Sequence, residues 1–314
     1  MGITRRCWMV PALLALVLVP GAVGGEAVGT SRDGPSDGVS AEERSRIEQA
    51  IPAKAPPPAA KGRRLLVIDL NVGRPGHRSI PHANLAVRLM GEKTGAYEAV
   101  ISHDRSMLAP DRLKAFDAVF LNNTLGPIFD TRELREGFSA FISGGGGLVA
   151  NHAVTVTSPE WPEFGEILGA RGAAHRDADE KVTVRLDDPA SPLNAAFGGQ
   201  GFTIADEIFR FQAPYSRRRV RVLLSVDVAK TDMNQGRPRG QCVRDDNDYP
   251  ISWIRRHGKG RVFYCSLGHN PYVFWDARML QHFLAGIQFA LGDLKADTTP
   301  SPERDKPTPA AQAP

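Results

Sequence analysis

The feature that most constrains this chain is a series of short, continuously apolar runs separated by amphipathic stretches. Residues 64–70 read RLLVIDL, and similar runs follow at 117–122 and 148–151. Between them, residues 83–93 and 131–142 place apolar side chains at helical spacing. Strands that are apolar on both faces and alternate with helices are typical of a parallel sheet covered on both sides. The sequence therefore predicts an open α/β fold with a mainly parallel sheet and helices on both faces.

The second half of the chain has a different pattern. Runs 181–186 and 220–226 alternate apolar and polar residues, as strands with one exposed face do. Runs 249–256 and 261–267 flank the tetrapeptide HGKG, which indicates a hairpin turn. A closing helix is expected over residues 276–291. We therefore expect an antiparallel extension of the parallel sheet.

The N-terminus has the pattern of a secretory signal peptide over residues 1–25. Arg5 and Arg6 precede an apolar run at 8–20, and small residues follow at 21–25. The apolar run is shorter than the roughly 20 residues that a bilayer-spanning helix needs. The sequence therefore predicts an exported protein, periplasmic or extracellular, with an uncleaved N-terminal anchor as the alternative.

The segments on either side of the α/β region are polar and rich in proline. Residues 26–63 are predicted to be a disordered linker, with one short helix from about Ser40 to Ile51 that Ser40 would cap. Residues 293–314 are predicted to be a disordered, proline-rich tail. One α/β domain over residues 64–292 remains.

Composition narrows the classes of function. The net charge of +4 is spread along the chain, without a basic patch interleaved with aromatic residues, so nucleic acid is not an expected partner. No integral membrane domain is expected. Cys242 and Cys265 lie beyond the predicted signal, and their pairing is left open. The chain has no CxxC motif, which argues against a zinc knuckle or a thioredoxin-like site.

Histidines recur where the predicted strands end. His77 and His82 follow the first strand, and His152 and His269 follow later apolar strands. Because ligands of open α/β sheets bind beyond the carboxyl ends of the strands, we expect a shared site, which His175 could also approach. Neutral imidazole transfers protons near neutral pH and binds metals. The other histidines are expected to be peripheral: His103, His257 and His282.

Polar side chains near the same strand ends could complete this site. Asp206 and Glu207 are adjacent, so on an extended strand they face opposite ways and only one can enter the site. A carboxylate beside imidazoles could orient them or act as a base, whereas an ion pair with Arg210 is an equally good reading. Asn122 and Asn151 supply amide groups suited to hydroxyl-rich ligands.

Four ordered motifs give the chain a family resemblance. The stretches GGGGLVANHAVT, WPEFGEILGARGAAH, ADEIFRF and YPISWIRRHGKGRVFYCSLGHNPYVFW resemble the ThuA-like (trehalose utilisation) family over residues 64–291. The resemblance implies a flavodoxin-like sheet, as in class I glutamine amidotransferases, and a connection with sugar metabolism. In true amidotransferases a cysteine nucleophile occupies a sharp turn after a core strand. Here His152 and Ala153 follow that strand, which excludes the cysteine-dependent reaction.

The leading hypothesis is an exported hydrolase, lyase or isomerase that acts on a sugar or keto-sugar derivative. The expected catalytic residues are His152, His269 and Glu207. The expected substrate-binding residues are His77, His82, Asn122, Asn151 and His175. The sequence assigns no cofactor and leaves a divalent metal open, with candidate ligands His77, His152 and His269. A non-catalytic carbohydrate-binding or scaffolding module is the alternative, and the oligomeric state is left open.

Overall fold

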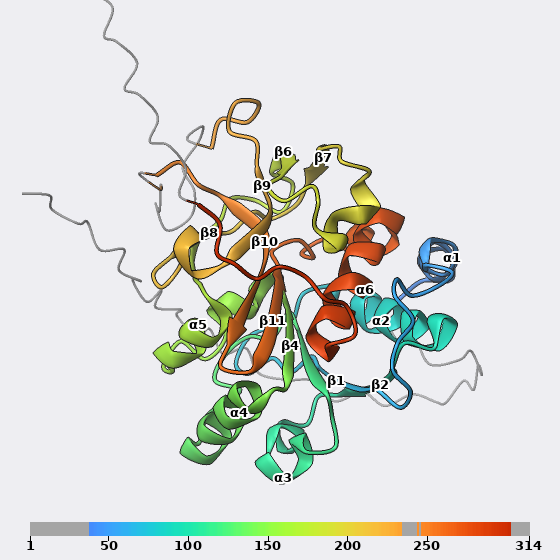
Figure 1. Ribbon diagram of the computed structural model, residues 1–314, viewed down its shortest axis with the longest axis vertical. Coiled ribbons are helices and arrows are strands. Elements are labelled where there is room, and N and C mark those ends of the chain that lie inside the picture. Colours follow the sequence, from blue (N-terminus) through green and yellow to red (C-terminus); the bar gives the residue numbers. More distant parts are fainter. Residues whose placement is uncertain (1–37, 234–243, 245, 303–314) are drawn as a thin grey trace, which may run out of the picture.

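The computed structural model describes residues 38–233, 244 and 246–302, and one large sheet organises this part of the chain (Figure 1). The sheet has nine strands in the order β2-β1-β3-β4-β11-β10-β9-β6-β7. Its first five strands are parallel to one another. Their bounds are β2 Glu98–Ser102, β1 Arg64–Ile68, β3 Ala118–Asn122, β4 Gly147–Asn151 and β11 Gly260–Cys265. The predicted α/β class is confirmed.

The other strands form the predicted antiparallel extension. β10 pairs antiparallel with β11 through the expected HGKG hairpin, and β9, β6 and β7 continue the sheet. Their bounds are β10 Pro250–His257, β9 Arg221–Val226, β6 Lys181–Leu186 and β7 Phe202–Ala205. A separate two-stranded ribbon pairs β5 (Arg171–Ala174) with β8 (Arg210–Gln212).

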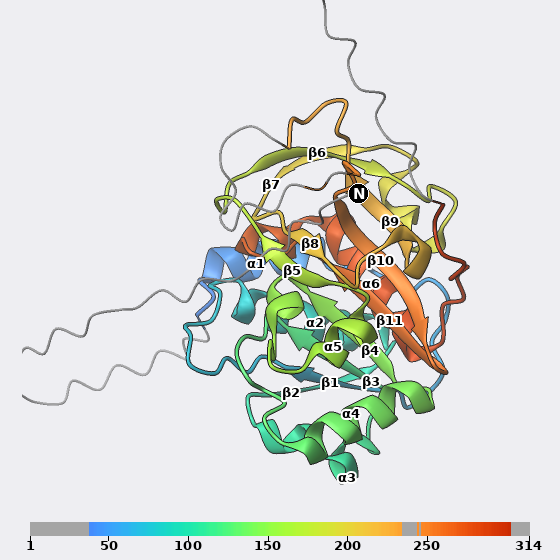
Figure 2. The ribbon, with the colours of Figure 1, turned by 90° about the vertical axis from the view of Figure 1, so that its left-hand side faces the viewer.

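Helices cover both faces of the sheet and create two cores (Figures 1 and 2). Successive side chains of β1 enter opposite cores, Leu65 and Val67 on one face and Leu66 and Ile68 on the other. The first core is covered by α2 (Ile80–Thr94) and α6 (Ala277–Leu291), and the second by α3 (Pro110–Leu113), α4 (Arg132–Gly144) and α5 (Pro162–Leu168). Five short 3₁₀ helices connect these elements: η1 Arg105–Leu108, η2 His152–Val156, η3 Pro192–Phe197, η4 Arg217–Arg219 and η5 Pro271–Trp275.

The segment before β1 is packed, which corrects the prediction of a disordered linker for residues 38–63. Helix α1 (Ala41–Ala50) begins at the expected cap, where Ser40 and Glu43 form a capping box. An isolated helix of this length would be marginal in water. Ile47 and Ile51 are buried against the domain, and α1 packs on α2 and η5, so tertiary contacts stabilise it.

The start of the predicted tail is also packed. Ser301 is buried; its N–H donates to the Val220 carbonyl, and its hydroxyl accepts from the Val222 N–H. The prediction of disorder from residue 293 is therefore wrong as far as residue 302. The predicted signal peptide, Cys242 and residues 303–314 lie outside the described residues. Within the described part, no helix has the length and apolarity needed to cross a membrane.

Candidate functional site

Four predicted site residues converge at the carboxyl end of the parallel strands. His77 lies between β1 and α2, His152 directly follows β4, Glu207 lies between β7 and β8, and His269 follows β11. One side-chain N or O atom of each lies within 4.8 Å of the corresponding atoms of the other three. The fold thus gathers residues from four separate chain segments, as the strand-exit argument predicted, and we call this group the histidine cluster.

His152 is held in an unusual backbone conformation at the centre of the cluster. Its φ of 48° lies in the left-handed region, which residues with a Cβ rarely adopt outside sites that require it. Its Nδ1 lies 2.8 Å from the Ser266 carbonyl, which can only accept, so Nδ1 carries a proton. Its Nε2 therefore presents a lone pair in the neutral ring. The sharp turn places that atom 3.3 Å from a carboxylate oxygen of Glu207 and 3.3 Å from Nδ1 of His269.

Glu207 is the anionic member of the cluster. Its Oε1 lies 2.8 Å from Nδ1 of His175, and its Oε2 lies 3.5 Å from Nδ1 of His269. Burial alone would raise the pKa of Glu207, but hydrogen bonding with His152, His175 and His269 holds it far below its usual range. The carboxylate is therefore ionised. A hydrogen bond from Nε2 of His152 to it requires a second proton on that ring; with the ring neutral, two acceptors face each other at 3.3 Å and a cation is needed between them.

His77 completes the cluster as a neutral ring. Its ring centroid lies 4.9 Å from those of both His152 and His269. Burial and the neighbouring imidazoles lower the pKa of His77 to about 3, so the ring is uncharged near neutral pH. Its Nδ1 is buried and has no hydrogen-bond partner among the described residues. A buried nitrogen left in that state is free to bind a ligand.

A polar network fixes the loops that carry these histidines. The Asp206 carboxylate accepts from the N–H groups of Gly268 and Asn270 at 2.7 and 3.0 Å, on both sides of His269. The Gly268 carbonyl in turn accepts from Ser79 and from Asn123, at 2.6 and 3.1 Å. Asp206 therefore orients the His269 loop while Glu207, facing the other way, enters the cluster.

Some predicted site residues have other positions. His175 joins the cluster through Glu207. His82 does not, because it is buried in the first turn of α2 against Arg78 and Glu43. Asn122 is also buried, and its amide donates to the Ile80 carbonyl and to Asn84. His82 and Asn122 have no exposed surface and lie outside the cluster, so the structure does not support the substrate-binding role predicted for them.

Asn151 and Arg210 have structural partners in the fold. Asn151 is buried, and its side-chain oxygen accepts from the Asn123 N–H, which places Asn151 beneath the site. The suggested ion pair between Arg210 and a neighbouring carboxylate does not form, because Arg210 pairs with Glu180 at 2.6 Å. Ser79 was missed entirely, since a lone serine before a predicted helix reads as an ordinary cap.

The turn at His152 supports the comparison with the amidotransferase elbow. A strained residue directly after a core strand is the geometry that presents a nucleophile in such folds. The chain has no thiol at that point. Cys265 lies in β11 and is fully buried, and burial raises the pKa of its thiol to about 12. A buried, protonated thiol is unsuited to act as a nucleophile, so Cys265 does not take the place of the absent elbow cysteine.

The mostly parallel sheet and the strand-exit cluster define an α/β protein with a histidine-rich site. The family model ThuA, described as trehalose utilisation, matches residues 64–290, and the chain belongs to this family. No protein in the curated set matches the chain.

Two solved structures have a similar fold. A ThuA-like protein from Bacteroides uniformis superposes with a TM-score of 0.57 at 22% identity, covering 74% of this chain and 93% of that one. A ThuA-like protein from Parabacteroides merdae gives a TM-score of 0.52 at 16% identity, covering 76% and 93%. At these identities the likeness shows the fold alone.

Proposed function

We propose that this protein is an exported enzyme of carbohydrate metabolism that acts on a sugar or keto-sugar derivative at the histidine cluster. Family membership supports a role in carbohydrate utilisation. The observation that carries the proposal is the convergence of three imidazoles and an ionised carboxylate within 4.8 Å at the strand ends. Such a group is costly to bury without a proton or cation to balance it.

The donor set fits a divalent metal ion. His77, His152, His269 and Glu207 would supply three nitrogens and one oxygen, a set suited to zinc and to other first-row metals. His152 already makes the supporting contact typical of metal-bound imidazole, a donation from its other nitrogen to a backbone carbonyl. When bound, the ion would polarise a carbonyl or hydroxyl oxygen of the sugar.

Exposure separates the roles of the histidines. His152 has no exposed surface, so it holds or orients rather than touching substrate. The side chains of His269 and His175 are 27% and 28% exposed, more than the 10% of Glu207 that they contact. His175, held by Glu207, is placed to take a proton from a sugar carbon next to a carbonyl, or from a hydroxyl.

The test compares purified protein with His152→Ala and with His257→Ala, a histidine of the β10–β11 hairpin used as the control. Each is analysed for bound metal and assayed against keto-sugars and disaccharides, with and without Zn²⁺ or Mn²⁺. We expect metal and turnover in the wild type and in His257→Ala, and neither in His152→Ala. Turnover by metal-free protein would eliminate the metal. Carbohydrate binding without turnover would favour a non-catalytic module instead.

Export rests on the charge, apolar run and small residues at positions 1–25. Expression of the full chain in a bacterial host, followed by cell fractionation and N-terminal sequencing, tests this part. A mature protein that begins near residue 26 outside the cytoplasm is expected. Retention of Met1 in the cytoplasmic fraction would overturn it.

A further inference from the structure

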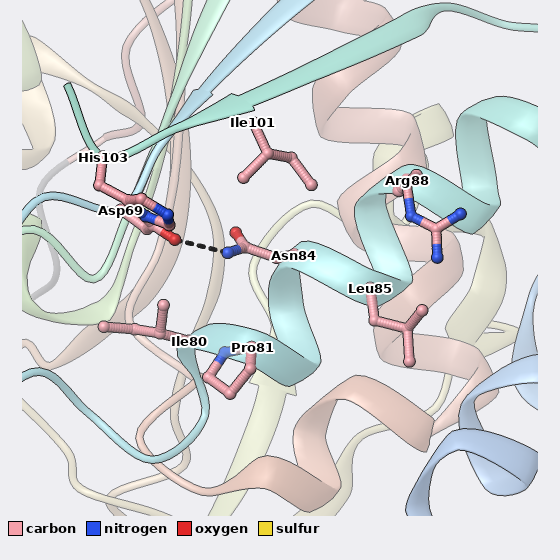
Figure 3. A pocket seen from close by; sticks show the side chains of 8 residues that line it. All are labelled: Asp69, Ile80, Pro81, Asn84, Leu85, Arg88, Ile101 and His103. Carbon is pink, nitrogen blue, oxygen red and sulfur yellow. Dashed lines mark hydrogen bonds and ion pairs between the residues drawn. The ribbon is translucent and has the colours of Figure 1, made fainter. Parts of the chain in front are cut away.

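A second polar site lies beside α2, at the ends of β1 and β2, and shares no residue with the histidine cluster (Figure 3). It is a cavity of about 420 Å³, within the range of roughly 300–1,000 Å³ typical of small-molecule sites. Its lining residues are Asp69, Ile80, Pro81, Asn84, Leu85, Arg88, Ile101 and His103. His103 was expected to be peripheral, and nothing in the histidine cluster requires it.

A chain of hydrogen bonds orients His103 at this cavity. Asn122 donates to Asn84 at 2.8 Å, Asn84 donates to Asp69 at 2.6 Å, and the other oxygen of Asp69 lies 2.6 Å from Nδ1 of His103. Because a carboxylate accepts, Nδ1 carries a proton, and Nε2 on the other side of the ring is left to form a hydrogen bond with a ligand. The dashed contact between Asn84 and Asp69, beside His103, is visible in Figure 3.

The charged carboxylate of this pair is buried and its imidazole is exposed, which is the opposite of what packing alone would give. The side chain of Asp69 is 4% exposed, whereas that of His103 is 81% exposed. An exposed ion pair contributes little to folding, and burying a carboxylate costs free energy. The buried Asp69 carboxylate forms hydrogen bonds with both Asn84 and His103 and fixes an exposed imidazole. It therefore does more to orient that ring than to stabilise the fold.

The rest of the lining indicates the class of ligand. Ile80, Pro81, Leu85 and Ile101 are apolar, and Arg88 lies one helical turn beyond Asn84. Arg88 pairs with Glu92 at 2.7 Å, so this end of the cavity is polar but has little net charge. Apolar walls with polar groups at both ends suit a neutral ring that carries hydroxyls, which is the chemistry of a monosaccharide.

We propose that this cavity is a second carbohydrate site, in which Nε2 of His103 forms a hydrogen bond with a sugar hydroxyl. The choice of ligand class rests on the proposed function of the histidine cluster. One turn of backbone links the cavity to the histidine cluster: the N–H of Ile80, which lines the cavity, donates to the carbonyl of His77 in the cluster.

Saturation-transfer NMR with D-glucose as the probe tests the cavity on the full chain. Variants are His103→Ala, Leu85→Trp to fill the cavity, His152→Ala in the cluster, and His257→Ala as the control. Because the histidine cluster is also proposed to bind sugar, His103→Ala and Leu85→Trp are compared in the His152→Ala background. There we expect glucose binding about tenfold weaker with His103→Ala, as for loss of one good hydrogen bond, and abolished with Leu85→Trp. Binding should persist in His257→Ala and, at the cavity, in His152→Ala.

The outcomes separate this proposal from the proposed function. Equal glucose binding by His152→Ala with and without His103→Ala, or no binding by His152→Ala, overturns the second site whatever the cluster does. If Leu85→Trp fails to fold, the exposed His103→Ala variant still decides. If glucose binding depends on His103 but the protein has neither metal nor turnover, the second carbohydrate site is supported and only the proposed enzymatic function is overturned.

Discussion

His152 and His282 are both fully buried, yet their surroundings differ. His282 lies in the core on α6, with Nδ1 2.8 Å from the Leu193 carbonyl and Nε2 2.9 Å from the Ser252 hydroxyl. Each of its nitrogens meets one neutral group, so the ring is satisfied by the fold itself. His152 uses one nitrogen in the same way, but its other nitrogen faces an ionised carboxylate and a second imidazole.

This difference separates a structural histidine from a functional one. Burial lowers the pKa of His282 to about 4, which keeps it neutral and compatible with the apolar rings around it. Packing needs no more than that. The histidine cluster instead gathers four titratable groups and a strained backbone, features that cost stability and that concentrate at functional sites.

The largest expected effect follows from His152→Ala. Turnover of the sugar substrate should fall by about 10³-fold, because the cluster loses its central nitrogen. The free energy of unfolding should change little by comparison, since the cluster costs stability in the wild type. Steady-state kinetics and urea unfolding measure the two quantities. An unchanged kcat/KM would place His152 with His282 as a structural residue.

His282→Ala should have the opposite profile. It leaves a cavity in the core and removes the partners of Ser252 and the Leu193 carbonyl, so we expect a loss of about 3 kcal/mol in unfolding free energy. Turnover per folded molecule should be unchanged. A fall in turnover without a fall in stability would show that the two buried histidines are not as different as their contacts indicate.

The pH dependence of stability sharpens the same comparison. The pKa of His282 is about 4 in the folded protein against about 6.5 when unfolded, so between these values the unfolded chain binds more protons. Titration of His282 therefore leaves the free energy of unfolding unaffected above pH 6.5 and lowers it by about 3 kcal/mol as the pH falls to 4. Urea unfolding at pH 7 and 4.5 should show a smaller drop in His282→Ala than in the wild type. Equal drops would contradict this assignment.

Glu207→Gln tests the charge of the cluster with little change in shape. The amide cannot balance a cation, so Zn²⁺ affinity should fall by about 10- to 100-fold. Isothermal titration calorimetry measures it, with Glu166→Gln, an exposed carboxylate that pairs with Arg219, as the control. Unchanged affinity would mean that a proton rather than a metal lies between Glu207 and His152.

The convergence of His77, His152, Glu207 and His269 could be predicted because parallel strands end at one edge of a sheet. His82 and Asn122 could not be placed in this way. The helix after β1 begins at Ile80, so His82 already belongs to its first turn, and Asn122 turns toward the same helix. Distance from a strand end does not tell which way a side chain points.

Two further features depended on tertiary contacts that local patterns do not contain. Asp69 and His103 follow different strands and meet only because β1 and β2 are neighbours. Helix α1 has a cap that the sequence reveals at Ser40, but only a weak apolar face. The sequence therefore predicts the helix but not its packing against the domain. Ile47 and Ile51 are too few to indicate packing until the surface that receives them is known.

The smallest effect concerns His82, a third buried histidine. Like His152 it faces a carboxylate, since its Nε2 lies 3.3 Å from Glu43 in the capping box of α1, but it lies outside the histidine cluster. Ser40→Ala removes the cap and should cost about 1 kcal/mol, with faster hydrogen exchange in α1 and unchanged Zn²⁺ affinity. Ser45→Ala, on the same helix but away from its cap, is the matched control. A loss of Zn²⁺ affinity in Ser40→Ala alone would mean that α1, through His82 and the His77 loop, supports the cluster rather than the fold.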